Sequence, residues 1–200
     1  MAAILSSLRN TVIAGFVLTL IPLVMYLNWG GTIDHPFGAF FIRWLHVGSG
    51  VMWIGLLWYF NFVQTPSMPK IPDDQKPAIS KVISPAALFW FRWSAMSTIV
   101  FGIILAQMNG YLVDAYTLGA AEGFAVPKDI AIGIGMWLGT IMWFNVWFVI
   151  WPNQKIALGI VDAAADQKPK AAKLAGQFSR INTMLSIPML FAMVSAQNIY

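Results

Sequence analysis

Five long apolar segments dominate this chain, and none of them contains an acidic residue or a lysine. Each has close to, or more than, the roughly 20 residues that a helix needs to cross the hydrocarbon core of a bilayer. The sequence therefore predicts an all-α integral membrane protein, a bundle of about five transmembrane helices. The expected spans are Thr11–Asn28, Gly38–Phe62, Ala87–Met108, Ile130–Trp151 and Ile181–Ile199.

Composition agrees with this class. Hydrophobic residues make up 58% of the 200 residues and charged residues 10%, against roughly 45–50% and 25% in a soluble domain. We expect one multi-pass domain over residues 1–200, surrounded by the lipid bilayer. The absence of cysteine excludes thiolate catalysis and cysteine-bound metal clusters. The basic residues lie in short loops beside the spans, which indicates membrane topology rather than nucleic-acid binding.

The positive-inside rule orients the predicted bundle. With five spans, only Arg43 and Lys128 fall on one side of the membrane. The other side receives Arg9, Lys70, Lys76, Lys81, Arg92, Lys155, Lys168, Lys170, Lys173 and Arg180. This distribution predicts a cytoplasmic N-terminus and a periplasmic C-terminus.

His46 is the most informative polar residue, because ionisable groups inside a membrane span are often functional. It lies about eight residues into the second predicted span, roughly 12 Å below the outer surface. Ser49 and Gly50 follow one helical turn later, Trp53 lies two turns away, and Arg43 precedes by one turn. Such a face has room for a flat macrocycle. Imidazole is a usual axial ligand of haem iron, and Arg43 is placed to pair with a propionate.

Two readings of His46 remain open at this stage. Small residues in membrane helices often allow close packing, and a buried histidine can simply hydrogen-bond a neighbouring helix. His35 is eleven residues earlier, so both histidines cannot bind one iron. A sixth ligand would be another subunit or a methionine, unless the position is open; the methionines considered are Met52, Met96, Met136, Met142, Met184, Met189 and Met193.

Gly133, Gly135 and Gly139 in the fourth span predict a helix-packing face, either within the domain or between protomers. The spans offer no carboxylate or lysine for a proton relay, and the sequence has no phosphate-binding glycine loop or catalytic triad. An enzyme built on this chain would need a cofactor or a partner. We therefore expect it to be at most a subunit of a membrane oxidoreductase.

Four stretches resemble, in the same order, the membrane domain of the cytochrome c-linked urate hydroxylase family: Phe41–Gln64, Ala87–Trp93, Met142–Lys155 and Ser179–Phe191. The Trp44-Leu45-His46 opening also resembles small haem-binding membrane proteins related to the four-helix type of protoporphyrinogen oxidase. These resemblances imply a bacterial inner-membrane location, a c-type cytochrome as partner, and haem b at His46. The chain departs from the family in having no Cys-x-x-Cys-His motif. It also lacks a histidine near the end of its last span.

Three functional hypotheses follow. The first is a membrane subunit of a redox system that holds haem b, or contacts a quinone, and exchanges electrons with a separate cytochrome c. The second is a non-catalytic structural subunit, packed against other membrane subunits or against copies of itself. The third and weaker one is a urate hydroxylase-like membrane domain.

Overall fold

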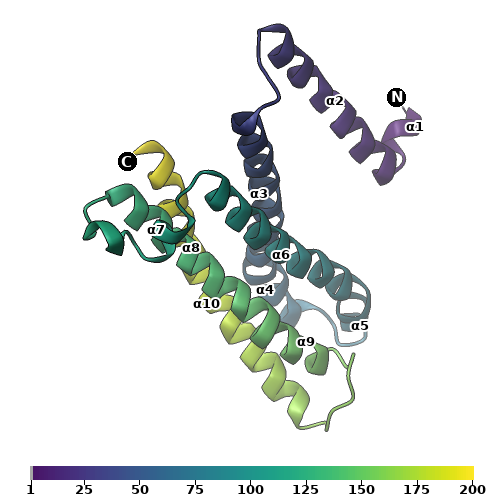
Figure 1. Ribbon diagram of the computed structural model, residues 1–200. Helices are drawn as coiled ribbons and strands as arrows, with labels where there is room; N and C mark the ends of the chain where they lie inside the picture. Colours follow the sequence, from purple (N-terminus) through teal and green to yellow (C-terminus); the bar gives the residue numbers. More distant parts are fainter. Residues whose placement is uncertain (1) are drawn as a thin grey trace. The chain divides into compact units, whose positions relative to one another are not determined.

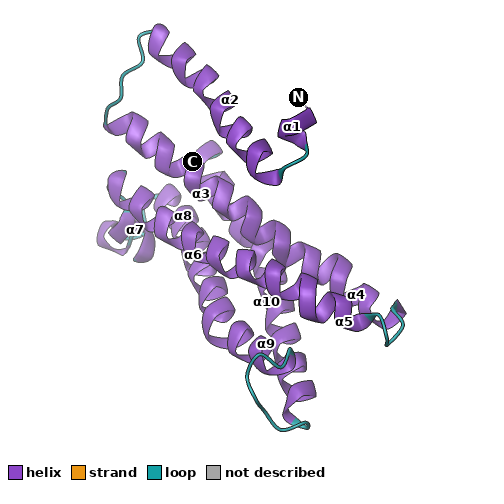
Figure 2. Ribbon diagram, turned by 90° about the vertical axis from the view of Figure 1, so that its right-hand side faces the viewer, coloured by secondary structure: helices purple, strands orange, loops and turns teal. Residues whose placement is uncertain are grey.

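The computed structural model describes residues 2–200 of the chain, with side chains from residue 4 onward. The described residues form helices joined by short turns, and no strand occurs among them. They fall into two compact units, the first ending at Phe40 and the second running from Phe41 to Tyr200. The predicted all-helical class is confirmed (Figures 1 and 2).

The first unit holds α1 (Ala2–Leu5), α2 (Leu8–Asn28) and the first turns of α3 (His35–Trp58). Asp34 caps α3, because its carboxylate accepts the backbone N–H of Phe37 at 3.0 Å and the hydroxyl of Thr32 at 2.7 Å. These hydrogen bonds favour the ionised carboxyl and lower the pKa of Asp34. The ring of Tyr26 stacks on Phe37 at 5.7 Å between centroids, which fixes the turn between the two helices.

The second unit contains the remaining helices. In chain order they are η1 (Tyr59–Gln64), α4 (Thr65–Ser67), η2 (Met68–Lys70), α5 (Lys76–Ala78), η3 (Ile79–Ile83), α6 (Ser84–Met108), α7 (Leu112–Tyr116), η4 (Ala120–Glu122), α8 (Pro127–Phe144), η5 (Asn145–Ile150), α9 (Trp151–Ala157) and α10 (Gln167–Asn198). Within this unit, α5 and α9 lie at one end of the long helices, and α7 and the C-terminus lie at the other (Figure 1).

Four helices among the described residues are long and apolar enough to cross a membrane: Leu8–Asn28, His35–Lys70, Lys76–Met108 and Pro127–Ala157. These lie over the first four predicted spans. The predicted fifth span, Ile181–Ile199, overlaps the C-terminal part of α10, which ends at Asn198. This helix is 32 residues long but carries more polar side chains. A multi-pass membrane protein is thus supported, whereas the number of five spans and the orientation of the termini stay predictions.

A core of large apolar side chains joins the helices of the second unit. It is built around Trp53 and Leu57 of α3, Phe91 of α6, Met142 of α8 and Val146 of η5, each 1% exposed or less. The long helix α10 lies along α8 and α9 (Figure 1). Because lipid is as apolar as these side chains, the tight fit between them, rather than exclusion from water, stabilises the contacts.

Asparagine side chains accompany two of the three π-helical turns. A π turn bonds i to i+5, so it leaves a nearby carbonyl without its usual helical donor. The amide of Asn61 in η1 donates to the Leu57 carbonyl at 2.9 Å. At η5 the amide of Asn182 donates to the Met142 carbonyl at 2.9 Å, and its oxygen accepts from Asn145 at 2.8 Å. These bonds supply inside the protein the partners that lipid cannot provide.

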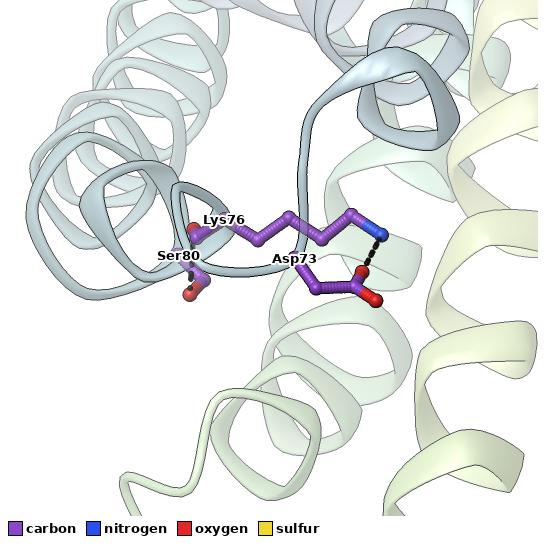
Figure 3. A network of polar contacts seen from close by, with 3 residues as sticks. All are labelled: Asp73, Lys76 and Ser80. Carbon is purple, nitrogen blue, oxygen red and sulfur yellow. Dashed lines mark hydrogen bonds and ion pairs between the residues drawn. The ribbon is translucent and has the colours of Figure 1, made fainter.

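The segment between η2 and η3 turns back through an ion pair. The Lys76 ammonium contacts the Asp73 carboxylate, and the Lys76 carbonyl accepts the hydroxyl of Ser80 at 3.2 Å (Figure 3). Lys76 thereby lowers the pKa of Asp73. The carboxylate is almost fully exposed, so the pair shapes the turn more than it stabilises the fold.

We predict that Asn182→Ala lowers the free energy of unfolding by about 1–3 kcal/mol, because it leaves a buried amide of Asn145 and a buried carbonyl without partners. The matched control is Asn198→Ala, since Asn198 is exposed and bonds only the carbonyl one turn earlier. Reversible unfolding in detergent micelles measures both variants. Equal stability of the two variants would contradict the role assigned to the buried amide pair.

Candidate ligand-binding cavity

His46 is held by a single hydrogen bond across the helix interface. Its Nδ1 lies 2.9 Å from the backbone carbonyl oxygen of Thr98 in α6. A carbonyl only accepts, so Nδ1 must carry the proton. The other ring nitrogen, Nε2, then presents a lone pair, and no described residue hydrogen-bonds to it. This is the state in which a histidine is ready to ligate a metal, with its second nitrogen fixed by a backbone carbonyl.

Gly102 makes this close approach possible. A Cβ placed on Gly102 would lie 3.0 Å from Cε1 and 3.1 Å from Nδ1 of His46, closer than side chains normally allow. The glycine therefore lets the Nδ1–Cε1 edge of the imidazole approach the backbone of α6. Because this edge of the ring faces α6, Nε2 is the ring nitrogen that α6 does not hold.

His46 lines a cavity of about 620 Å³ between α3, α6, α8 and α10. This volume is within the range of about 300–1,000 Å³ that is typical of sites for small molecules and cofactors. Most of the lining is apolar, and glycines widen it on three helices, at Gly50, Gly55, Gly102 and Gly139. The cavity thus combines one imidazole with a large apolar space.

Polar groups gather where the cavity approaches the end that carries α7. Arg43 of α3 donates to the Gln197 amide oxygen of α10 at 3.1 Å, and both residues line the cavity together with Tyr111. Burial raises the pKa of the Tyr111 phenol, while the nearby Arg43 charge partly opposes the shift. The phenol therefore keeps its proton at neutral pH and can donate it to a ligand. One cation and one hydroxyl donor suit an anionic substituent such as a carboxylate.

The structure brings together most of the residues that the sequence selected. Arg43, His46, Gly50 and Trp53 all line the cavity, whereas Ser49 does not. Three partners had no sequence signal that pointed to the site: the Thr98 carbonyl, Gly102 and Tyr111. Gln197 could be noticed as a polar residue in the fifth predicted span, but its pairing with Arg43 could not. A backbone acceptor in particular leaves no trace in residue identity.

The glycines of α8 face three different neighbours. A Cβ at Gly133 would collide with the carbonyl of Ala115 in α7, and one at Gly135 would lie 3.0 Å from Met193 of α10. Gly139 faces Ile99 of α6 and lines the cavity. Within the described residues these glycines therefore serve packing inside the domain.

Three of the seven methionines considered as ligands line the cavity, namely Met136, Met189 and Met193. Met142 is instead buried in the apolar core, with an exposed fraction of 0%. A thioether can act as an axial ligand of haem iron, so these three side chains are the candidates for a second ligand. No group of three or more histidine, cysteine or acidic side chains that could hold a metal ion occurs among the described residues.

Comparisons with known proteins match parts of the chain. A family model described as urate oxidase N-terminal matches residues 111–199. This supports the urate-oxidase part of the predicted resemblance, but the cytochrome c-linked hydroxylase family is not confirmed. The segment that carries His46 lies outside the matched residues.

The chain is also 27% identical over 159 residues to an uncharacterized transporter of Schizosaccharomyces pombe, a match that covers 70% of this chain and 27% of that protein. The chain thus spans little more than a quarter of that curated relative. No solved structure matches the chain.

We predict that Gly102→Ala destabilises the protein by about 1–3 kcal/mol, because the added methyl group must displace the imidazole. Gly48→Ala is the matched control, since nothing lies within 4 Å of a Cβ at that position. The control is expected to be neutral or slightly stabilising, as alanine favours helix over glycine by up to about 1 kcal/mol. Thermal unfolding in detergent measures both, and a neutral Gly102→Ala would show that the close contact is not required.

Proposed function

We propose that this chain is a membrane subunit of a redox system that binds haem b through His46. The observation that carries the proposal is an imidazole whose Nδ1 proton is held by the Thr98 carbonyl while Nε2 is left free at an apolar cavity of about 620 Å³. Such a nitrogen is a better iron ligand than one that shares its lone pair with a neighbouring helix. A purely structural role for His46 would explain the hydrogen bond of Nδ1, but it would not explain the cavity beside the ring.

The residues present fit a haem. Nε2 of His46 would bind the iron, Arg43 and Tyr111 would pair with propionate oxygens, and a thioether of Met136, Met189 or Met193 would be the second ligand. Bound haem supplies reversible one-electron transfer at iron. The protein would tune this chemistry through the Thr98 carbonyl, which makes the imidazole more basic, and through the apolar lining, which keeps water from the metal.

The location of the cavity supports exchange with an extramembrane partner. Its polar residues lie toward the end with α7, where the positive-inside rule places the outer surface of the membrane. A c-type cytochrome on the outer side, as the family resemblance implies, would meet this end of the domain. We extend the proposal to a bacterial inner-membrane location on the same grounds.

A second candidate function is transport of a small apolar or aromatic molecule. The cavity lies between membrane-crossing helices, and the partial relative from Schizosaccharomyces pombe is named a transporter. For this function His46 and Arg43 would orient the transported molecule, and His46 would bind no iron.

We predict that the purified chain has the absorption spectrum of haem b and that His46→Ala loses its reduced band, because the side chain that would bind the iron is gone. His35→Ala is the matched control, since His35 is exposed at the start of α3, and it should retain the band. Adding imidazole to His46→Ala should partly restore it by filling the emptied ligand position. Spectra of the oxidised and reduced forms, with haem content per chain, give the measurement.

A colourless, folded preparation that takes up no added haem would contradict the redox proposal. It would then favour the carrier or a non-catalytic structural subunit. A His46→Ala variant with an unchanged spectrum would show that another side chain binds the iron.

A further inference from the structure

Arg92 is a buried cation without a polar partner. It is 9% exposed and lies on α6, eight residues from the start of that helix. Its guanidinium carbon is 3.3 Å from the centroid of the Trp151 ring at the start of α9. Among the residues that the structure describes, none hydrogen-bonds to Arg92 or forms an ion pair with it, and its Nη1 is fully buried.

The stacked ring does not complete the surroundings of this group. A cation–π contact satisfies the flat face of the guanidinium. Its five N–H donors lie in the plane, however, and point away from the ring. An arginine this deeply buried is costly unless its donors are used. The Arg92 guanidinium therefore lacks a hydrogen-bond acceptor at the edge that carries Nη1.

A second cation lies near the same ring as Arg92. The Lys155 ammonium is 5.8 Å from the centroid of the same Trp151 ring. Two cations near one aromatic ring repel each other, and an anion close to both would offset that repulsion.

The ion pairs found among the described residues do not involve Arg92. Asp166 pairs with Lys170 at 2.9 Å, and Asp73 pairs with Lys76 (Figure 3). Arg92 and Lys155 take part in no ion pair with the described residues. The missing acceptor should therefore come from outside the chain.

We propose that Arg92, with Lys155, binds a phosphate group at the membrane surface. The planar fork of arginine matches two phosphate oxygens, and lysine adds a point charge. Trp90, Trp93, Trp147 and Trp151 surround this level of the helices, as expected at the headgroup interface. Basic pockets between membrane helices are a known way to hold lipid phosphates. The site is separate from the His46 cavity, which Arg92 does not line.

The test uses the delipidated chain in neutral detergent. Native mass spectrometry measures binding of phosphatidylglycerol, with phosphatidylcholine as the zwitterionic lipid and inorganic phosphate as the free anion. Arg92→Gln should weaken binding of the phosphate ligand by about tenfold or more, as expected for charge-assisted bonds. Arg92→Lys should lose less, because it keeps the charge but not the fork. Arg180→Gln is the matched control, since Arg180 is exposed on α10.

The arms of the experiment separate the source of the phosphate. Arg92-dependent binding of phosphatidylglycerol alone identifies a lipid headgroup, whereas Arg92-dependent binding of inorganic phosphate identifies a free anion. If Arg92→Gln does not fold, the comparison of Arg92→Lys with the wild type decides. The proposal would be overturned if Arg92→Lys and Arg92→Gln bound every ligand as tightly as the wild type. It would also be overturned if Arg180→Gln weakened binding as much as the Arg92 variants do. None of these results depends on haem.

Discussion

In hydrocarbon no water is available to a polar group, so each donor and acceptor must find its partner inside the protein. Hydroxyl side chains of α6, α8 and α10 find this partner within their own helix, because each donates a hydrogen bond to a backbone carbonyl of the preceding turn. Thr98, Thr140 and Ser186 all do so, at 2.7–2.8 Å. Such residues cost the membrane helix little and carry no ligand chemistry.

The informative groups are those that this local solution cannot serve. The imidazole of His46 reaches across to a backbone carbonyl of α6, the Asn182 amide reaches across to α8, and the indole of Trp58 reaches Ser186 at 2.9 Å. Each bond fixes one helix against another at a defined level. Where even this fails, as for Nε2 of His46 and for the buried Nη1 of Arg92, the polar group remains available to a ligand from outside the chain.

Sequence reasoning recovered the helical membrane class, because long apolar segments admit few other structures. It also selected His46, Arg43, Gly50 and Trp53 from the spacing of a single helix, and the structure places all four at one cavity. Helical periodicity indicates which residues share a face, so these four residues of one helix could be predicted from the sequence. The Thr98 carbonyl, Gly102 and Gln197 come from other helices. Their approach to His46 depends on tertiary packing, which the spacing of residues along one helix does not reveal.

The same limit applied to the C-terminal helix. Its predicted start at Ile181 was set by hydropathy, whereas α10 begins at Gln167, in front of a run of exposed lysines. Pro169 lies in its first turn, where a proline costs no helical hydrogen bond. Hydropathy marks the residues that enter lipid and not the ends of the helix. A helix that continues beyond the bilayer surface becomes more polar there without ending.

The π turns at residues 59–64, 79–83 and 145–150 all lie in helix segments toward the end that carries α5 and α9. Each accommodates one residue more than an α turn of the same span, so the helical phase shifts there by about 100°. Loss of a single residue within such a turn would return it to ordinary α geometry and leave the flanking faces in register. Loss of one residue between Arg43 and Trp53 would instead rotate half of the cavity lining away from its partners. One-residue deletions should therefore be tolerated better in the π turns than in the part of α3 that lines the cavity.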